Sequence, residues 1–167
     1  NYQYEILLLL LKKEMHGRGL AKELKTSLTR VQSALNDLRN MNILDYKVEG
    51  KNHVYFIKKN LVSKSAILNT ENYKLTKIIN RHPELEPIFQ DIINGSKCSL
   101  ILLFGSYAKE NAKKESDIDI YIETTNKKIK SDVQDIYDLL SVKIGKFNID
   151  DLLIKEIIKN HAIIKVG

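Results

Sequence analysis

Four residues of the sequence have the types and spacing that phosphate and metal chemistry requires. Gly105 and Ser106 follow a short apolar run, and Asp117 and Asp119 come after a spacer of ten residues. The apolar run predicts a buried strand that ends at the Gly-Ser pair, where a helix begins. A glycine lets a phosphate approach the backbone closely, and the serine hydroxyl and free N–H groups donate hydrogen bonds to it.

The two aspartates belong to a second predicted strand, residues 117–123. Side chains two residues apart leave the same face of a strand, so the carboxylates repel each other unless a cation lies between them. Mg²⁺ is the natural cation where oxygen ligands meet phosphates. We therefore expect Asp117 and Asp119 to bind one or two Mg²⁺ ions that orient a nucleoside triphosphate and activate a hydroxyl. The alternative is a plain turn at Gly105-Ser106 and an exposed strand face at the aspartates.

The segments 102–109 and 116–120 resemble the motif of minimal nucleotidyltransferases of the polymerase-β superfamily. The resemblance covers roughly residues 75–167 and includes residues 157–164, which look like the closing helix and strand of such domains. It implies a mixed sheet with helices and a catalytic metal site at the two aspartates. It also implies nucleotide binding by Gly105, Ser106 and Lys109. A solvated surface lysine is an equal interpretation of Lys109.

Two departures from the family pattern concern activity. Glu110 stands where active members usually have glycine, and the strand expected at 142–147 lacks the third carboxylate that members usually add. It offers Lys143 and Lys146 instead. The nearest acid is Asp150, which we name as a candidate third ligand or base. Asp151 is expected to cap the last helix.

The first 60 residues predict a winged helix, that is, three helices followed by a β-hairpin. Apolar residues recur at helical spacing in 3–14, 20–24 and 28–38, and strand-like runs at 43–48 and 53–57 flank a turn. This order resembles winged-helix DNA-binding domains, whose third helix enters the major groove. The expected fold is therefore α+β, with a winged helix at 1–60, a linking helix or connector at 61–80, and a nucleotidyltransferase domain at 81–167.

Charge supports a nucleic-acid partner for the first domain. Residues 1–60 contain 11 Lys or Arg and 6 Asp or Glu, whereas residues 61–167 contain 16 and 15. On the third helix Thr29, Arg30 and Ser33 are the expected base contacts, Arg30 being able to contact guanine in a bidentate way. Lys51 at the hairpin tip is expected to meet double-stranded DNA at a phosphate. A protein-docking or dimerisation module is the alternative.

Two functions from different classes follow. One is Mg²⁺-dependent transfer of a nucleoside monophosphate to a hydroxyl of a protein, a small molecule or a nucleic acid. Members of the resembled family that are paired with HEPN-type toxins modify a partner protein, so the resemblance makes an antitoxin role, with a toxin as acceptor, one form of this function. The other is a DNA-binding regulator with a degenerate transferase domain that binds nucleotide or mediates assembly. The single cysteine, Cys98, and the absence of a long apolar run favour a cytoplasmic protein without a membrane partner. We also expect a homodimer.

Overall fold

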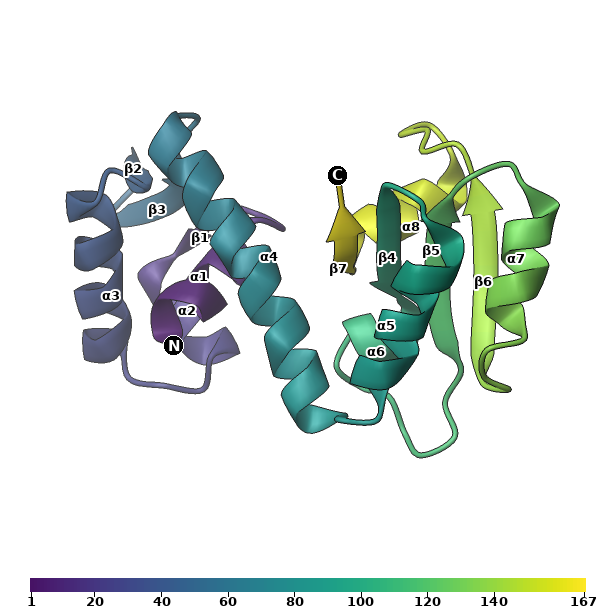
Figure 1. Cartoon of the computed structure of the whole chain (residues 1–167). Coiled ribbons are helices and arrows are strands. Elements are labelled where there is room, and N and C mark those ends of the chain that lie inside the picture. The colour runs from purple at the N-terminus through teal and green to yellow at the C-terminus, as the bar shows by residue number, and fades with distance from the viewer. The chain divides into compact units, whose positions relative to one another are not determined.

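The structure is a computed structural model that describes residues 1–167. The chain divides into two compact units, Asn1–Tyr73 and Lys74–Gly167 (Figure 1). Each unit has its own apolar core. The α+β class expected from the sequence is confirmed. No helix has the length and apolar content needed to span a membrane.

The first unit contains three short helices and a three-stranded sheet. These elements are α1 (Tyr2–Leu10), β1 (Met15–His16), α2 (Gly17–Glu23), α3 (Leu28–Asn40), β2 (Leu44–Glu49) and β3 (Asn52–Ile57). The order of helices and hairpin matches the predicted winged helix. The two-residue strand β1 was not predicted, and it pairs with β3 to give the sheet order β1-β3-β2.

Helix α3 has the apolar face that its sequence predicts. The Ser27 hydroxyl accepts a hydrogen bond from the Arg30 N–H at 3.3 Å and caps the first turn. Val31, Leu35 and Leu38 are buried at spacings of four and three residues. The opposite face of α3 is therefore left to solvent.

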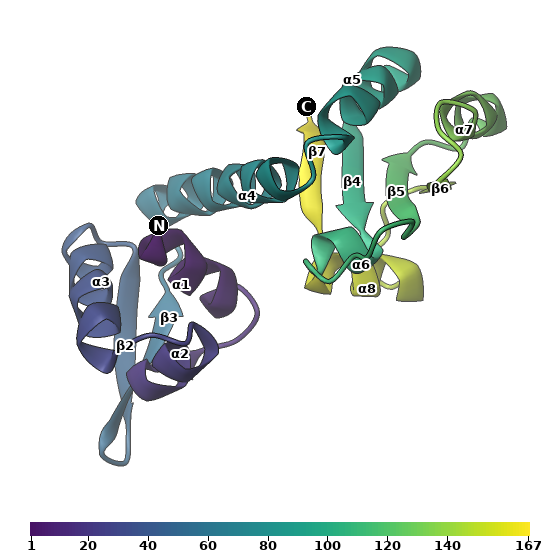
Figure 2. The ribbon, with the colours of Figure 1, turned by 90° about the horizontal axis from the view of Figure 1, so that it is seen from below.

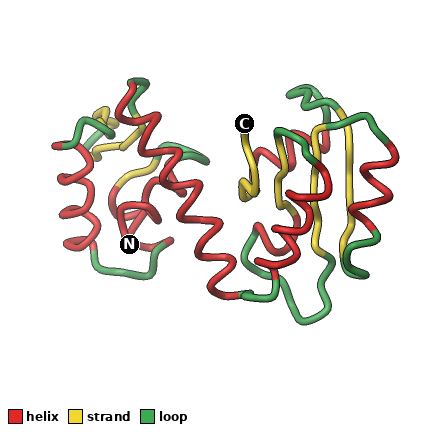
Figure 3. Tube along the Cα trace, viewed as in Figure 1, coloured by secondary structure: helices red, strands yellow, loops and turns green.

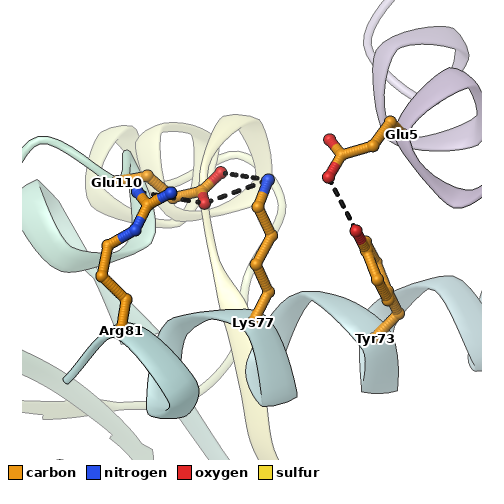
Figure 4. Close-up of polar contacts among 5 residues, drawn as sticks. All are labelled: Glu5, Tyr73, Lys77, Arg81 and Glu110. Atoms are coloured by element: carbon orange, nitrogen blue, oxygen red, sulfur yellow. Dashed lines mark hydrogen bonds and ion pairs between the residues drawn. The ribbon is translucent and has the colours of Figure 1, made fainter. Parts of the chain in front are cut away.

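The long helix α4 (Leu61–Arg81) crosses the boundary between the units. The segment 61–80, expected as a linking helix or connector, is thus helical. In the first unit, the Tyr73 hydroxyl donates a hydrogen bond to Glu5 at 2.8 Å (Figure 4). The Tyr73 ring stacks on Tyr4 with centroids 4.9 Å apart. In the second unit, Ile78 is buried in the core.

The second unit is a four-stranded sheet with the order β6-β5-β4-β7. β4 pairs antiparallel with β5 and β7, and β5 pairs parallel with β6. Figures 2 and 3 show α5 and α7 on one face of the sheet and α8 on the other. The elements are α5 (Leu85–Ser96), β4 (Leu100–Phe104), α6 (Gly105–Ala108), β5 (Ile118–Glu123), α7 (Lys127–Gln134), β6 (Leu140–Gly145), α8 (Leu152–Lys159) and β7 (Ala162–Val166).

The sequence pattern of residues 133–140 is typical of a helix, and this prediction is wrong. Helix α7 ends at Gln134, and strand β6 already begins at Leu140. The Gln134 side chain explains the early end, because it hydrogen-bonds the backbone of the edge strand. Its oxygen accepts from the Val142 N–H at 3.0 Å, and its amide nitrogen donates to the Leu140 carbonyl. Gln134 thereby satisfies backbone groups that an edge strand otherwise leaves unpaired.

Candidate functional site

The sheet register brings the Gly-Ser pair and the aspartates together. Strand β4 ends at Phe104, and β5 begins beside it, with Phe104 opposite Asp119 in the antiparallel pairing. Gly105 and Ser106 follow Phe104 directly and start helix α6. Asp117 immediately precedes β5 and is exposed, whereas Asp119 is half-buried. The residues that the sequence analysis linked by type are therefore neighbours in space.

Gly105 and Asp119 are in direct contact. Gly105 has φ +68°, in the left-handed region that favours glycine. A Cβ atom added there would lie 2.8 Å from the Cγ atom of Asp119, and closer still to its Oδ2 atom. The Asp119 carboxylate therefore occupies the space that any larger residue at position 105 would fill. Glycine is therefore required at position 105 to accommodate the aspartate.

Helix α6 is short, and backbone hydrogen bonds close its C-terminal end. The Asn111 N–H donates to the Ser106 carbonyl at 3.0 Å, and the Glu110 N–H donates to the Tyr107 carbonyl at 3.0 Å. This pair of bonds is a Schellman-type end. Tyr107 is buried and packs edge-on against His82, with ring centroids 4.9 Å apart. Tyr107 thus supports the helix from the core and is not free to stack on a base.

Glu110 stands at the position of the Schellman turn where glycine is usual. Its φ is +59°, which is unfavourable for a residue with a side chain. Its carboxylate pairs with Lys77 at 3.2 Å and with Arg81 at 3.6 Å, both on α4 (Figure 4). The turn after Lys109 keeps the left-handed conformation, and these ion pairs offset part of its cost.

The electrostatics of Asp119 reflect its crowded position. Burial raises the pKa of the Asp119 carboxyl above its ordinary value, and the nearby charge of Asp117 raises it further. The ammonium groups of Lys143 and Lys109 act on this pKa in the opposite direction. Two carboxylates held near each other fit a divalent cation, because a cation removes both the burial cost and the repulsion.

The structure supplies no third carboxylate to this pair. Strand β6, next to β5, contains no acidic residue. Asp150 is exposed in the turn before α8, where its N–H donates to the Asn148 side chain at 3.0 Å. No group of three His, Cys, Asp or Glu side chains is arranged to hold a metal ion. Asp151 caps α8, as expected, by accepting from the Leu153 N–H at 2.7 Å.

Comparison with known protein families agrees with this site. The family model described as polymerase beta, nucleotidyltransferase matches residues 84–167. The chain belongs to this family. A search of curated proteins finds no match. A solved structure of a ZitR mutant from Lactococcus lactis is similar at 20% identity and a TM-score of 0.41, over 51% of this chain and 58% of that one.

Within the nucleotidyltransferase-family domain, the nucleotide residues expected from the sequence lie along α6. Gly105 and Ser106 form its first turn, and Lys109 is exposed directly after its last residue. Lys109 is close enough to influence the pKa of Asp119. The position of Lys109 is thus compatible with reaching a phosphate held between α6 and the aspartate pair.

The predicted DNA contacts of the first unit are only partly available. Thr29, Arg30 and Ser33 are exposed on α3. The Arg30 guanidinium, however, donates to the Tyr2 hydroxyl at 3.2 Å and lies over the Tyr2 ring, 5.3 Å from its centroid. Arg30 would have to leave Tyr2 before it could read a base. A sequence separation of 28 residues hides this contact from local pattern analysis.

A polar cleft lies between α3, the start of α2 and the hairpin of the first unit. Its volume is about 230 Å³, and Lys51 is part of its wall. Arg18 and Gln32 line the cleft with Lys51 and were not predicted from the sequence. The polar and charged side chains around the cleft are those of His16, Arg18, Gln32, Lys51, Asn52 and His53. The only sequence signal for Arg18 is its place between two glycines at a helix start.

We predict that Gly105→Ala disrupts the site. The new methyl group collides with the Asp119 carboxylate and forces a left-handed residue, so the free energy of unfolding should fall by roughly 1–3 kcal/mol and Mg²⁺ binding should weaken. Denaturant unfolding and metal titration measure both effects. Gly95→Ala is the matched control, because its nearest side-chain atom lies 4.0 Å from the added Cβ. Equal stability of the two variants would contradict the contact.

We predict that Asp119→Asn stabilises the metal-free protein at neutral pH. The folded state raises the pKa of the Asp119 carboxyl. Its protonated form therefore favours folding when the pH is below the ordinary carboxyl pKa, and this contribution to stability is lost as the pH rises through the raised pKa. The gain in the free energy of unfolding should therefore vanish as the pH falls towards about 4. Unfolding curves from pH 4 to pH 8 test this, with the exposed Asp150→Asn as control. A variant less stable than wild type at pH 7 would exclude it.

Proposed function

We propose that this nucleotidyltransferase-family protein is a DNA-binding regulator whose second unit binds a nucleoside triphosphate together with Mg²⁺. The contact between Gly105 and Asp119 supports this most directly, because it joins the start of α6 to the aspartate pair. A backbone that a phosphate can approach and two carboxylates that attract a cation then lie in one place.

Each part of the site has a role in this proposal. Asp117 and Asp119 would hold Mg²⁺, which supplies charge neutralisation and Lewis-acid polarisation of the phosphate. The Ser106 hydroxyl and the backbone at Gly105 would donate hydrogen bonds to the terminal phosphates. Lys109 would add a point charge from the end of α6. Sheet pairing holds the junction between β4 and α6 on one side, and the Schellman end of α6 holds it on the other.

Transfer of a nucleoside monophosphate to a hydroxyl is the second candidate, and the intact aspartate pair favours it. In that reaction the hydroxyl oxygen bonds to the α-phosphorus, the bond to pyrophosphate breaks, and the hydroxyl proton passes to a base. Neither β6 nor Asp150 provides an additional carboxylate beside the pair. We therefore rank binding above rapid transfer, with a partner protein such as a toxin among the acceptors to test.

The first unit is proposed to bind duplex DNA as a homodimer. Its basic excess and the exposed face of α3 favour a polyanionic partner. The cleft is compatible with one backbone phosphate, because cationic and amide side chains converge on it: Arg18, Gln32, Lys51 and Asn52. Helix α3 would lie in the major groove with Thr29 and Ser33 at base edges.

The nucleotide proposal predicts binding that depends on Mg²⁺ and on the aspartate pair. The wild-type chain should bind a labelled nucleoside triphosphate, and the double variant Asp117→Ala plus Asp119→Ala should lose the Mg²⁺-dependent part. Equilibrium binding with and without Mg²⁺ measures this. The same mixtures, supplied with candidate hydroxyl acceptors, report transfer of label. Covalent labelling lost in the double variant would establish the second candidate, and absence of binding would reject both.

The DNA proposal predicts that the cleft matters more than Arg30. Arg18→Ala plus Lys51→Ala should weaken duplex binding and lower the salt slope by about 0.9, the contribution of the one phosphate contact that the cleft is proposed to make. Arg30→Ala should have a smaller effect, because Arg30 is held by Tyr2. The control Arg39→Ala plus Lys59→Ala removes two charges outside the cleft. Equal losses in the two double variants would reject the cleft, and no duplex binding by wild type would favour a protein-docking module.

A further inference from the structure

The strand beside the aspartate pair carries a lysine on the same face as Asp119. Strand β6 runs parallel to β5, and the register pairs Asp119 with Ser141 and Tyr121 with Lys143. Val142 is buried in the core beneath α5, whereas Tyr121 is buried in the cluster beneath α8. Because side chains alternate along a strand, Lys143 lies on the α8 side with Tyr121 and Asp119. It is one strand across and two residues along from Asp119.

Lys143 and Lys109 influence the same carboxylate from two different elements. Both ammonium groups lower the pKa of Asp119, although burial and Asp117 outweigh them. Lys109 follows α6, and Lys143 is in the neighbouring strand β6. Lys143 is exposed, so a ligand can reach its side chain. The aspartate pair is thus flanked by two positive charges as well as being open to solvent.

We propose that Lys143 is a phosphate-binding residue of the nucleotide site, and that the triphosphate is held there with a single divalent cation. This inference rests on the proposed nucleotide binding by the second unit. With Asp117 and Asp119 as its acids, the site offers carboxylate ligands for one ion. A second Mg²⁺ would have to approach the Lys143 ammonium without a further carboxylate to offset the repulsion. A lysine at this place neutralises phosphate charge without needing ligands of its own.

The sequence around Lys143 provides a matched control. Lys146 is also exposed and lies just after β6, so its removal changes the net charge equally. A lysine that is only a solvated surface charge would make the two substitutions equivalent. Because Lys143 is exposed on an edge strand whose buried residues stay unchanged, its variants should fold. Thermal unfolding of each variant checks this before binding is compared.

The first measurement is the affinity of the full chain for a non-hydrolysable ATP analogue at fixed Mg²⁺. We expect Lys143→Ala to weaken binding about tenfold, as loss of one charge-assisted phosphate contact does, and Lys146→Ala to stay within about twofold of wild type. Wild-type binding with equal affinities for the two variants would overturn the role of Lys143 while leaving the proposed function intact. Failure of the wild type to bind would reject the proposed function and this inference together.

The second measurement counts metal ions. Mn²⁺ titration followed by electron paramagnetic resonance, in the presence of the analogue, should give one tightly bound ion per wild-type chain. Lys143→Asp places a third carboxylate on the same face and should add a second bound ion, which Lys146→Asp should not. Two tightly bound ions in the wild type would overturn the single-cation part of the inference.

Discussion

The contact between the Asp119 carboxylate and the backbone of Gly105 is the constraint on which the site of the second unit depends. It requires Phe104 to stand opposite Asp119, because only this register brings the end of β4 to the start of β5. The register is in turn fixed by burial, since Ile118 and Ile120 fill the core on the other face of β5. A slip by one residue would turn Asp119 into that core. The hydrophobic core therefore determines the geometry of the polar site.

Local patterns predicted this arrangement well where burial alternates cleanly. The apolar run before Gly105 and the alternation around Asp119 indicated the two strands. The residue types of the Gly-Ser pair and of the aspartates indicated that these residues form one site. Helix α3 was predicted for the same reason. Patterns failed where a distant partner decides the outcome. The end of α7 depends on Gln134 reaching the edge of β6, and the state of Arg30 depends on Tyr2. Neither partner is visible in a window of one helix or strand.

Glu110 shows how a departure from a family pattern can be compatible with the fold. Glycine would satisfy its left-handed backbone at no steric cost, whereas glutamate costs on the order of 1 kcal/mol. The ion pairs with Lys77 and Arg81, of which the Lys77 pair is the more sheltered from solvent, offset part of this cost. These ion pairs also connect the turn that ends α6 to the last turns of α4. Glutamate at position 110 therefore makes the turn itself less favourable but adds a contact between α4 and the end of α6, two elements of the same unit.

Strand β6 explains why membership of the nucleotidyltransferase family does not by itself establish that this protein is catalytically active. The two faces of β6 have different surroundings. Leu140 and Val142 are buried in the core, whereas Ser141 and Lys143 lie on the side of the aspartates. Core residues hold the strand in register regardless of what the other face carries. An acid on that face can therefore be replaced by a lysine without loss of the sheet, and the change falls on the charge of the site alone. Fold and chemistry are separable on this strand, and its site-facing residues must be assessed by their own charge.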